Sequence, residues 1–289
     1  MNKHVTRGNM AGAVAGLLLL SAAVSSAAEL TKETLQEWQD YIRFANLRMQ
    51  ERLDGGAPFL WIDESPERGR RVRAGEILVA PVGEQSPIRV SKGLIHDWIG
   101  SALIPNARLE DIFVVVQDYS RYKDFYKPLV IDSQALEPDG TDWRFSLLML
   151  SKSLFAKTAL VSEWKDRYIR VGDRQWYSVA YSTRVEEIAE YGSPDAHKLP
   201  PDAGSGYIWR LYSFARFEQR DEGVYVELEA MALSRDIPAA LRWVIDPMVR
   251  RVSRGSVLNS LVETRSAVQS AVRVSGPHPK DRSVTVVTR

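Results

Sequence analysis

Apolar residues recur every three or four positions near the start of the chain. In residues 30–53 this stripe consists of Leu35, Trp38, Ile42, Ala45 and Met49. Such spacing places the side chains on one side of an α-helix. Thr31 stands where an N-cap is favoured, and the Gly55-Gly56 pair ends the pattern. The sequence therefore predicts a helix over residues 30–53.

The pattern is broken between residues 58 and 87. Two short apolar runs, 59–62 and 76–82, predict short strands or edge segments. Between them lies an arginine- and glycine-rich stretch, and we interpret its cluster at 68–73 as a solvated loop. The main domain is expected to begin at Ile88.

Beyond residue 88 the apolar and polar positions alternate, which predicts strands separated by turns such as Gly172-Asp173. The predicted strands are residues 94–104, 129–136, 143–150, 156–168, 175–188, 207–219 and 224–234. Residues 109–116 are predicted to form a short helix. Residues 192–206 are predicted to form a long loop, and loops of this length are usually functional or mobile.

A long amphipathic helix is predicted at the end of the chain, over residues 239–272. Asp236 is its expected cap, and Pro238 is tolerated beside the first turn. Pro247 and Gly255 are expected to kink this helix or to split it. The prolines and charges after it predict a disordered tail at 274–289.

The two strands before the final helix have one apolar and one charged face. The apolar face carries Trp209, Leu211, Ser213, Ala215 and Phe217, followed in the next strand by Val226, Leu228, Ala230 and Ala232. We expect this face to meet the long helix. The other face carries Arg216, Glu227 and Glu229, which we interpret as exposed ion pairs.

Small side chains on the apolar face predict unfilled volume beneath the helix. The predicted ligand-binding residues are Trp209, Leu211, Ser213, Ala215, Val226, Leu228, Ala230, Trp243 and Tyr122. The alternative is a filled core, in which bulky side chains such as Trp243, Met248 and Trp209 occupy that space.

Residues 1–28 have the layout of a secretory signal peptide. Lys3 and Arg7 precede an apolar run, and small residues at 25–28 follow it. We therefore expect a periplasmic or secreted protein. The alternative is a membrane-anchored protein that keeps an uncleaved signal.

Composition and charge exclude several classes of function. A net charge of +1 argues against a nucleic-acid partner, and the absence of cysteine excludes disulfides and thiolate metal sites. The four histidines lack metal-ligand spacing, and no nucleotide motif occurs. Neighbouring strand residues His96 and Asp97 point to opposite faces and form no dyad. No catalytic residue, metal or cofactor is therefore assigned.

Several segments resemble the SRPBCC superfamily, which contains the START lipid-transfer domains and the polyketide cyclase-like proteins. The resemblance lies in residues 94–100 (LIHDWIG), the short helix after them, and residues 118–128 (DYSRYKDFYKP). Residues 206–212 (GYIWRLY) and 232–238 (ALSRDIP) resemble an exported bacterial branch of that group.

The resemblance covers residues 90–272 and implies an α+β, helix-grip fold. In that fold a curved antiparallel β-sheet is wrapped around a long C-terminal α-helix, here with an extra N-terminal helix. The predicted organisation is a signal peptide (1–28), an N-terminal helix with short strands (29–87), a START-like helix-grip domain (88–273) and a disordered tail (274–289).

The resemblance implies an exported protein that binds or transfers a hydrophobic, lipid-like molecule. One alternative is a cyclase- or dehydratase-like enzyme, which requires converging ionisable residues such as His96 with Arg184 or Glu186. The other is an interaction protein with a filled core. The expected partner is a hydrophobic small molecule, with transient membrane contact as a further possibility; the sequence indicates no oligomeric state.

Overall fold

The computed structural model describes residues 29–152 and 157–275. Its helices are α2 (Lys32–Leu53), η1 (Trp61–Glu64), α3 (Pro66–Arg73), α4 (Leu109–Val116), η2 (Tyr119–Arg121), α5 (Tyr122–Phe125), η3 (Ala239–Leu241) and α6 (Arg242–Ser275). Its strands are β1 (Leu78–Pro81), β2 (Ile88–Val90), β3 (Gly93–Pro105), β4 (Val130–Asp139), β5 (Asp142–Lys152), β6 (Lys157–Arg170), β7 (Gln175–Ala189), β8 (His197–Lys198), β9 (Arg210–Arg220) and β10 (Gly223–Arg235). The predicted signal peptide at 1–28 lies outside the described residues.

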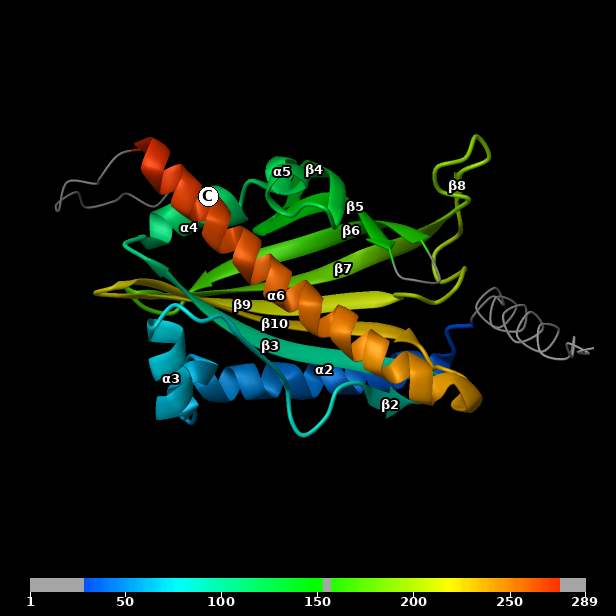
Figure 1. Ribbon diagram of the computed structural model, residues 1–289, viewed down its shortest axis with the longest axis horizontal. Helices are drawn as coiled ribbons and strands as arrows, with labels where there is room; N and C mark the ends of the chain where they lie inside the picture. The colour runs from blue at the N-terminus through cyan, green and yellow to red at the C-terminus, as the bar shows by residue number, and fades with distance from the viewer. Residues whose placement is uncertain (1–28, 153–156, 276–289) are drawn as a thin grey trace, which may run out of the picture.

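In the described part of the chain, ten strands form one sheet in the order β1-β3-β10-β9-β7-β6-β5-β4. Strand β2 pairs with β3, and β8 pairs with β7; all pairs are antiparallel. Helix α6 crosses one face of this sheet and α2 lies against the other (Figure 1). We call these the α6 face and the α2 face. A curved antiparallel sheet around a long C-terminal helix is the helix-grip fold, as predicted.

Helix α2 forms where the apolar stripe predicted it. The Thr34 backbone N–H donates to the Thr31 side-chain oxygen at 3.2 Å, so Thr31 is the N-cap. Trp38, Ala45 and Met49 are buried and pack against side chains of the α2 face. The extra N-terminal helix is thus a covering layer of the sheet.

Residues 59–73 differ from the prediction. The expected strand at 59–62 is replaced by η1, and the expected solvated loop at 68–73 lies in α3. The reason is local, because the Ser65 side chain accepts the backbone N–H of Arg68, and Pro66 occupies the first helical turn. Val72 is fully buried and attaches α3 to the core.

The strands predicted beyond residue 88 are present, and the short helix α4 has the predicted bounds. The long loop at 192–206 contains the two-residue strand β8. Its end is fixed by the Glu187 carboxylate, which accepts the backbone N–H groups of Ser205 at 2.7 Å and Tyr207 at 3.1 Å.

Helix α6 packs closely against the sheet at Gly100 of β3. A Cβ atom at this position would lie 2.8 Å from Leu261 Cδ1 and 2.9 Å from Val257 Cγ1. Glycine therefore permits the contact between helix and strand.

Of the two outcomes expected at Pro247 and Gly255, a kink or a split, the split does not occur, because α6 continues through both residues. Burial of Val257 and Leu261 against the sheet stabilises the helix beyond these weak positions. The helix also extends to Ser275, so the predicted tail begins too early. Residues 276–289 lie outside the described residues.

Candidate functional site

The structure gathers most of the predicted ligand-binding residues on the α6 face. In the register of β9 and β10, Ser213 lies opposite Ala230, Ala215 opposite Leu228, and Leu211 opposite Ala232. Val226 lies opposite Phe217, but both are buried in the core cluster beneath α6. The candidate site is therefore the part of this face nearer to Leu211 than to Val226.

The centre of the α6 face is floored by small side chains. The register continues from Ser213 to Ala180 of β7, so small residues lie side by side on three neighbouring strands. We call Ala180, Ser213, Ala215, Ala230 and Ala232 the small-residue patch. On these three strands the side chains fill less space above the sheet than large side chains would, whereas the flanking partners Trp98 of β3 and Asp166 of β6 are larger.

In the middle of β9 and β10, burial differs between the two faces of the sheet. All members of the small-residue patch are only half-buried. On the α2 face of the same strands, Phe214 and Met231 are each 1 % exposed. Central strands of a filled core would be buried on both faces. Solvent therefore reaches the α6 face at the centre of the sheet, which makes it the candidate ligand site.

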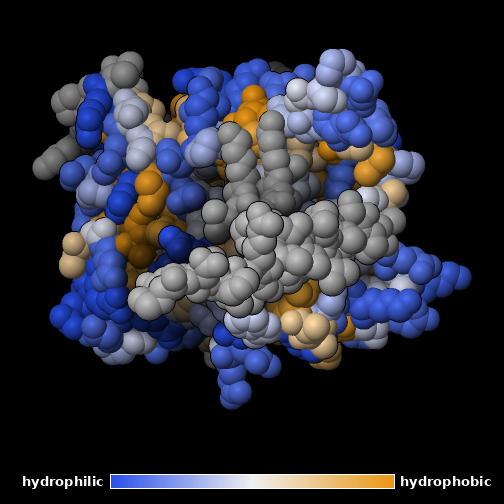
Figure 2. All heavy atoms as spheres, turned by 45° about the vertical axis from the view of Figure 1, so that its right-hand side comes forward, coloured by the Kyte–Doolittle hydropathy of each residue, from blue (hydrophilic) through white to orange (hydrophobic). Residues whose placement is uncertain are grey.

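Hydrophobic residues reach the molecular surface in several places. Figure 2 shows them among hydrophilic side chains.

An aromatic cluster borders the site on β5 and β6. Phe145 stacks on Tyr119 with ring centroids 4.3 Å apart, and on Trp164 with centroids 5.8 Å apart. The hydroxyl of Tyr122 donates to the Val116 carbonyl at 2.6 Å. The predicted site residue Tyr122 is therefore tied to the end of α4 and belongs to this wall.

Asp166 is a candidate site residue that the sequence analysis did not identify. The Tyr119 hydroxyl donates to its Oδ2 at 3.0 Å, while its Oδ1 is buried without a hydrogen-bond partner. Its strand register places it opposite Ala180, beside the small-residue patch. Burial raises the pKa of this carboxyl to about 7. It can therefore hold or release a proton near neutral pH.

A sequence signal for Asp166 did exist. It shares the odd–even position of Trp164 and Tyr168, whereas Lys165 and Arg167 alternate to the other face. An acidic residue on the apolar side of an alternating strand is unusual and marks a candidate site.

His96 and Asp97 occupy opposite faces, as the alternation predicts. His96 Nε2 lies 2.9 Å from the Ser234 hydroxyl oxygen, and burial lowers the pKa of His96 to about 4. The carboxylate of Asp97 accepts the Tyr41 hydroxyl at 2.7 Å beneath α2. His96 is thus a neutral polar group, and no dyad forms.

The charged side chains of the α2 face form a buried ionic network. Arg216 Nε donates to Glu227 at 2.8 Å, and Arg216 Nη2 donates to Glu229 at 3.3 Å. Arg48 of α2 reaches Glu229 at 3.0 Å. The expectation of exposed ion pairs is wrong here, because α2 and η1 cover these charges. They attach the N-terminal layer and do not face the candidate site.

Two predicted site residues lie elsewhere. Trp209 precedes β9 and packs within the core cluster of the α2 face. Trp243 is 80 % exposed at the start of α6, so it does not fill the space beneath the helix.

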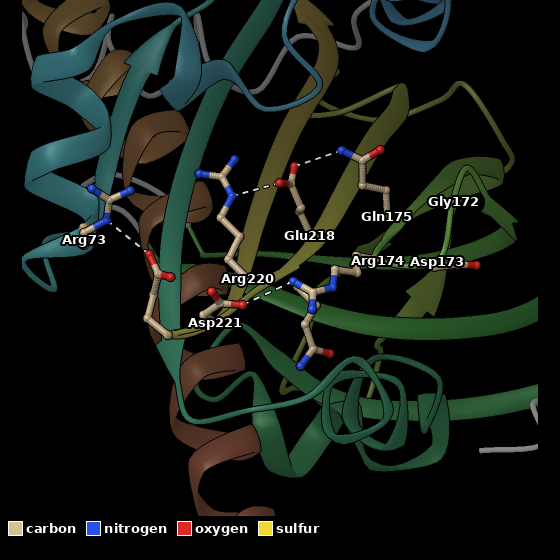
Figure 3. Close-up of a pocket in the computed structure, with 10 residues that line it drawn as sticks. Arg73, Gly172, Asp173, Arg174, Gln175, Glu218, Arg220 and Asp221 are labelled. Atoms are coloured by element: carbon tan, nitrogen blue, oxygen red, sulfur yellow. Dashed lines mark hydrogen bonds and ion pairs between the residues drawn. The ribbon is translucent and has the colours of Figure 1, made fainter. Parts of the chain in front are cut away.

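A charged cleft of about 620 Å³ lies at the end of the sheet, beside the β6–β7 and β9–β10 turns. In Figure 3 its arginines point toward carboxylates: Arg73 pairs with Glu222 at 3.1 Å and Arg174 with Asp221 at 3.3 Å. Charged and polar side chains dominate its lining. Such a cleft does not suit an apolar ligand.

Within residues 29–152 and 157–275, no cluster of acidic or histidine side chains is arranged to hold a metal ion. In the same residues, no helix is both long and apolar enough to cross a membrane.

Comparisons with known proteins find likeness in structure only. No protein-family model matches the sequence, and no curated protein matches it. A STAR-related lipid transfer protein from Xanthomonas axonopodis is 16% identical with a TM-score of 0.42, over 66% of this chain and 98% of that one. The Zhui aromatase/cyclase from Streptomyces is 12% identical with a TM-score of 0.42, over 63% and 98%. Human STARD10 is 11% identical with a TM-score of 0.41, over 71% and 80%.

These proteins resemble the chain in fold alone. At such identities and TM-scores, neither the ligand nor the activity of this protein can be inferred from them.

Proposed function

We propose that this protein binds a hydrophobic, lipid-like small molecule between its sheet and helix α6. The observation that carries the proposal is the small-residue patch, which is half-buried at the centre of the α6 face. An apolar ligand would remove this surface from water, which is favourable by roughly 25 cal/mol per Å². The aromatic wall around Phe145 and Trp164 would bound the ligand on one side.

We propose further that the protein carries its ligand outside the cytoplasm, as a binding or transfer protein. The support is the signal-like sequence of residues 1–28, with its basic start, apolar run and small residues. Isolation from the periplasm of an expressing bacterium, with the N-terminal residue determined by mass spectrometry, tests this part. Retention of residues 1–28 in the membrane fraction would favour the anchored alternative.

Ligand binding is tested by filling the proposed space. Ala215→Phe places a bulky side chain in the patch, and we expect it to weaken binding of an anthroyloxy-labelled fatty acid at least about tenfold, or about 1.4 kcal/mol. Ala74→Phe, at the exposed end of α3 and away from the candidate site, is the matched control and should leave affinity unchanged. Equal affinity of wild type and Ala215→Phe, or no binding by the delipidated wild type, would contradict the proposal.

A second candidate is an enzyme that acts on the bound ligand. His96 does not converge with Arg184 or Glu186. His96 lies on the α6 face, opposite Ala232, whereas Arg184 and Glu186 pair with each other on the other face of the sheet. Asp166 with the Tyr119 hydroxyl is instead the ionisable pair beside the patch. For this candidate, Asp166→Asn should abolish turnover of a bound polyketide or keto lipid while preserving its affinity.

A further inference from the structure

The first half of α6 presents cationic side chains that are not neutralised. Arg250, Arg251 and Arg254 are exposed, and none forms an ion pair within the described residues. The acidic residues nearby are engaged with other arginines: Asp236 pairs with Arg242 at 2.9 Å, and Asp246 pairs with Arg89 at 3.2 Å. This end of the helix therefore carries a local positive charge, although the net charge of the chain is only +1.

A large apolar side chain accompanies these arginines. Trp243 is 80 % exposed, and residues 238–240 before it, Pro-Ala-Ala, are also exposed. Leaving a large aromatic side chain in water forgoes roughly 1.5–3 kcal/mol of burial energy. An exposed tryptophan thus lies near arginines that form no ion pair within the described residues.

The spacing of these residues places them on one stripe of the helix. Trp243, Arg250 and Arg254 are separated by seven and four positions, which brings them to the same side of an α-helix. The same stripe continues to Val257 and Leu261, which are 3 % and 2 % exposed against the sheet. One helical face is thus packed in its second half and open to solvent in its first half.

We propose that the first half of α6 docks on an anionic phospholipid bilayer. Tryptophan favours the membrane interface, because its ring is apolar and its N–H is polar. Arginine side chains near an anionic membrane surface contribute about 1 kcal/mol each. Trp243 and residues 238–240 are apolar and match the interior of a bilayer, whereas the arginines that follow match its anionic head groups. An acidic protein surface would match the arginines but leave Trp243 and residues 238–240 in water.

This docking does not depend on a bound ligand, so it goes beyond the proposed function. If both proposals hold, the bilayer lies beside the part of α6 that adjoins the small-residue patch. A hydrophobic molecule would then have a short path between membrane and protein.

Vesicle co-sedimentation of the full chain tests the proposal. Vesicles of phosphatidylcholine alone are compared with vesicles that contain about one third phosphatidylglycerol, an amount chosen to give a negative surface potential. We expect binding to the anionic vesicles, and the triple variant R250Q/R251Q/R254Q should reduce it at least about tenfold. Trp243→Ala should reduce binding to the anionic vesicles as well.

Matched controls separate this surface from general charge. The triple variant R121Q/R170Q/R174Q removes the same charge from exposed arginines elsewhere, and Trp143→Ala removes another partly exposed tryptophan. Both should bind like wild type. Since residues 1–28 are common to all variants, they cannot cause a difference between them.

Three results would overturn the proposal. The first is wild-type protein that binds neither vesicle, and the second is an α6 triple variant that binds as well as wild type. The third is Arg250-dependent binding to soluble polyglutamate without binding to anionic vesicles, which would identify an acidic protein surface as the partner. Ligand affinity measured on the same variants keeps this test independent of the proposed function.

Discussion

Asp166 is a carboxyl group held on the apolar side of β6, between Trp164 and Tyr168. Its raised pKa of about 7, against an ordinary value of 3.8, has burial as its main cause. The folded protein therefore binds this proton more tightly than the unfolded chain does. The resulting stabilisation is complete below about pH 4 and is lost as the pH rises through about 7.

Replacing Asp166 with asparagine should remove this pH dependence. One pKa unit corresponds to about 1.4 kcal/mol, so the wild type should lose on the order of 4 kcal/mol that the variant does not lose between pH 4 and pH 8. Urea denaturation at several pH values measures the difference. The control is Asp221→Asn, whose side chain is 95% exposed. Parallel stability profiles for Asp166→Asn and wild type would show that Asp166 is not the titrating group.

At the scale of elements, the contact between β3 and α6 depends on Gly100. Its missing side chain leaves room for Leu261 and Val257, both of which are nearly fully buried. Gly255 on the same helix differs, because a Cβ atom there would meet nothing within 4 Å. The two glycines therefore have different physical roles.

Alanine substitutions at these glycines should shift stability in opposite directions. Gly100→Ala forces α6 away from β3 and should destabilise the protein by about 1–3 kcal/mol. Gly255→Ala should stabilise it by roughly 0.5–1 kcal/mol, because glycine is unfavourable within a helix. Thermal and chemical denaturation of both variants measure the signs. Stabilisation by Gly100→Ala would mean that the helix does not need this close approach.

At the scale of the whole molecule, the protein consists of α2, the sheet and α6 in three layers. The ionic network around Arg216 joins the sheet to the α2 layer, since Arg48 and the Trp61 backbone N–H reach Glu229 and Glu227. Arg216 is 1 % exposed, so its charge is compensated inside the protein and not by water. Breaking this network should affect the attachment of the N-terminal layer.

Arg216→Met should leave buried carboxylates without their cation and destabilise the protein by about 3–5 kcal/mol. The double variant R216M/E227Q removes one of those charges and should recover part of the loss. Equilibrium denaturation gives the two values, and hydrogen exchange in Lys32–Leu53 reports on α2. An Arg216→Met variant as stable as wild type would show that the network contributes little to the layer contact.

Much of the fold could be predicted because its signals are local. The spacing of Trp38, Ala45 and Met49 predicts α2, and alternation predicts the strands that pair as β9 and β10. The segment around Pro66 was misjudged, because an arginine-rich composition outweighed its capping signal. The site was only partly predictable: Ser213, Ala215 and Ala230 share the expected face, whereas Asp166 was overlooked and Trp209 packs on the other side.

The spacing of residues along the chain was enough to predict the helix periods, the strand alternation and the small residues on one face of β9 and β10. These follow from the geometry of a single element, in which spacing alone decides which side chains share a face. In contrast, the burial of Glu227 and Glu229 and the exposure of Trp243 could be seen only in the folded protein. The reason is that burial depends on which distant segment covers a face. Helix α2 covers the two carboxylates, whereas no segment of the described chain covers Trp243.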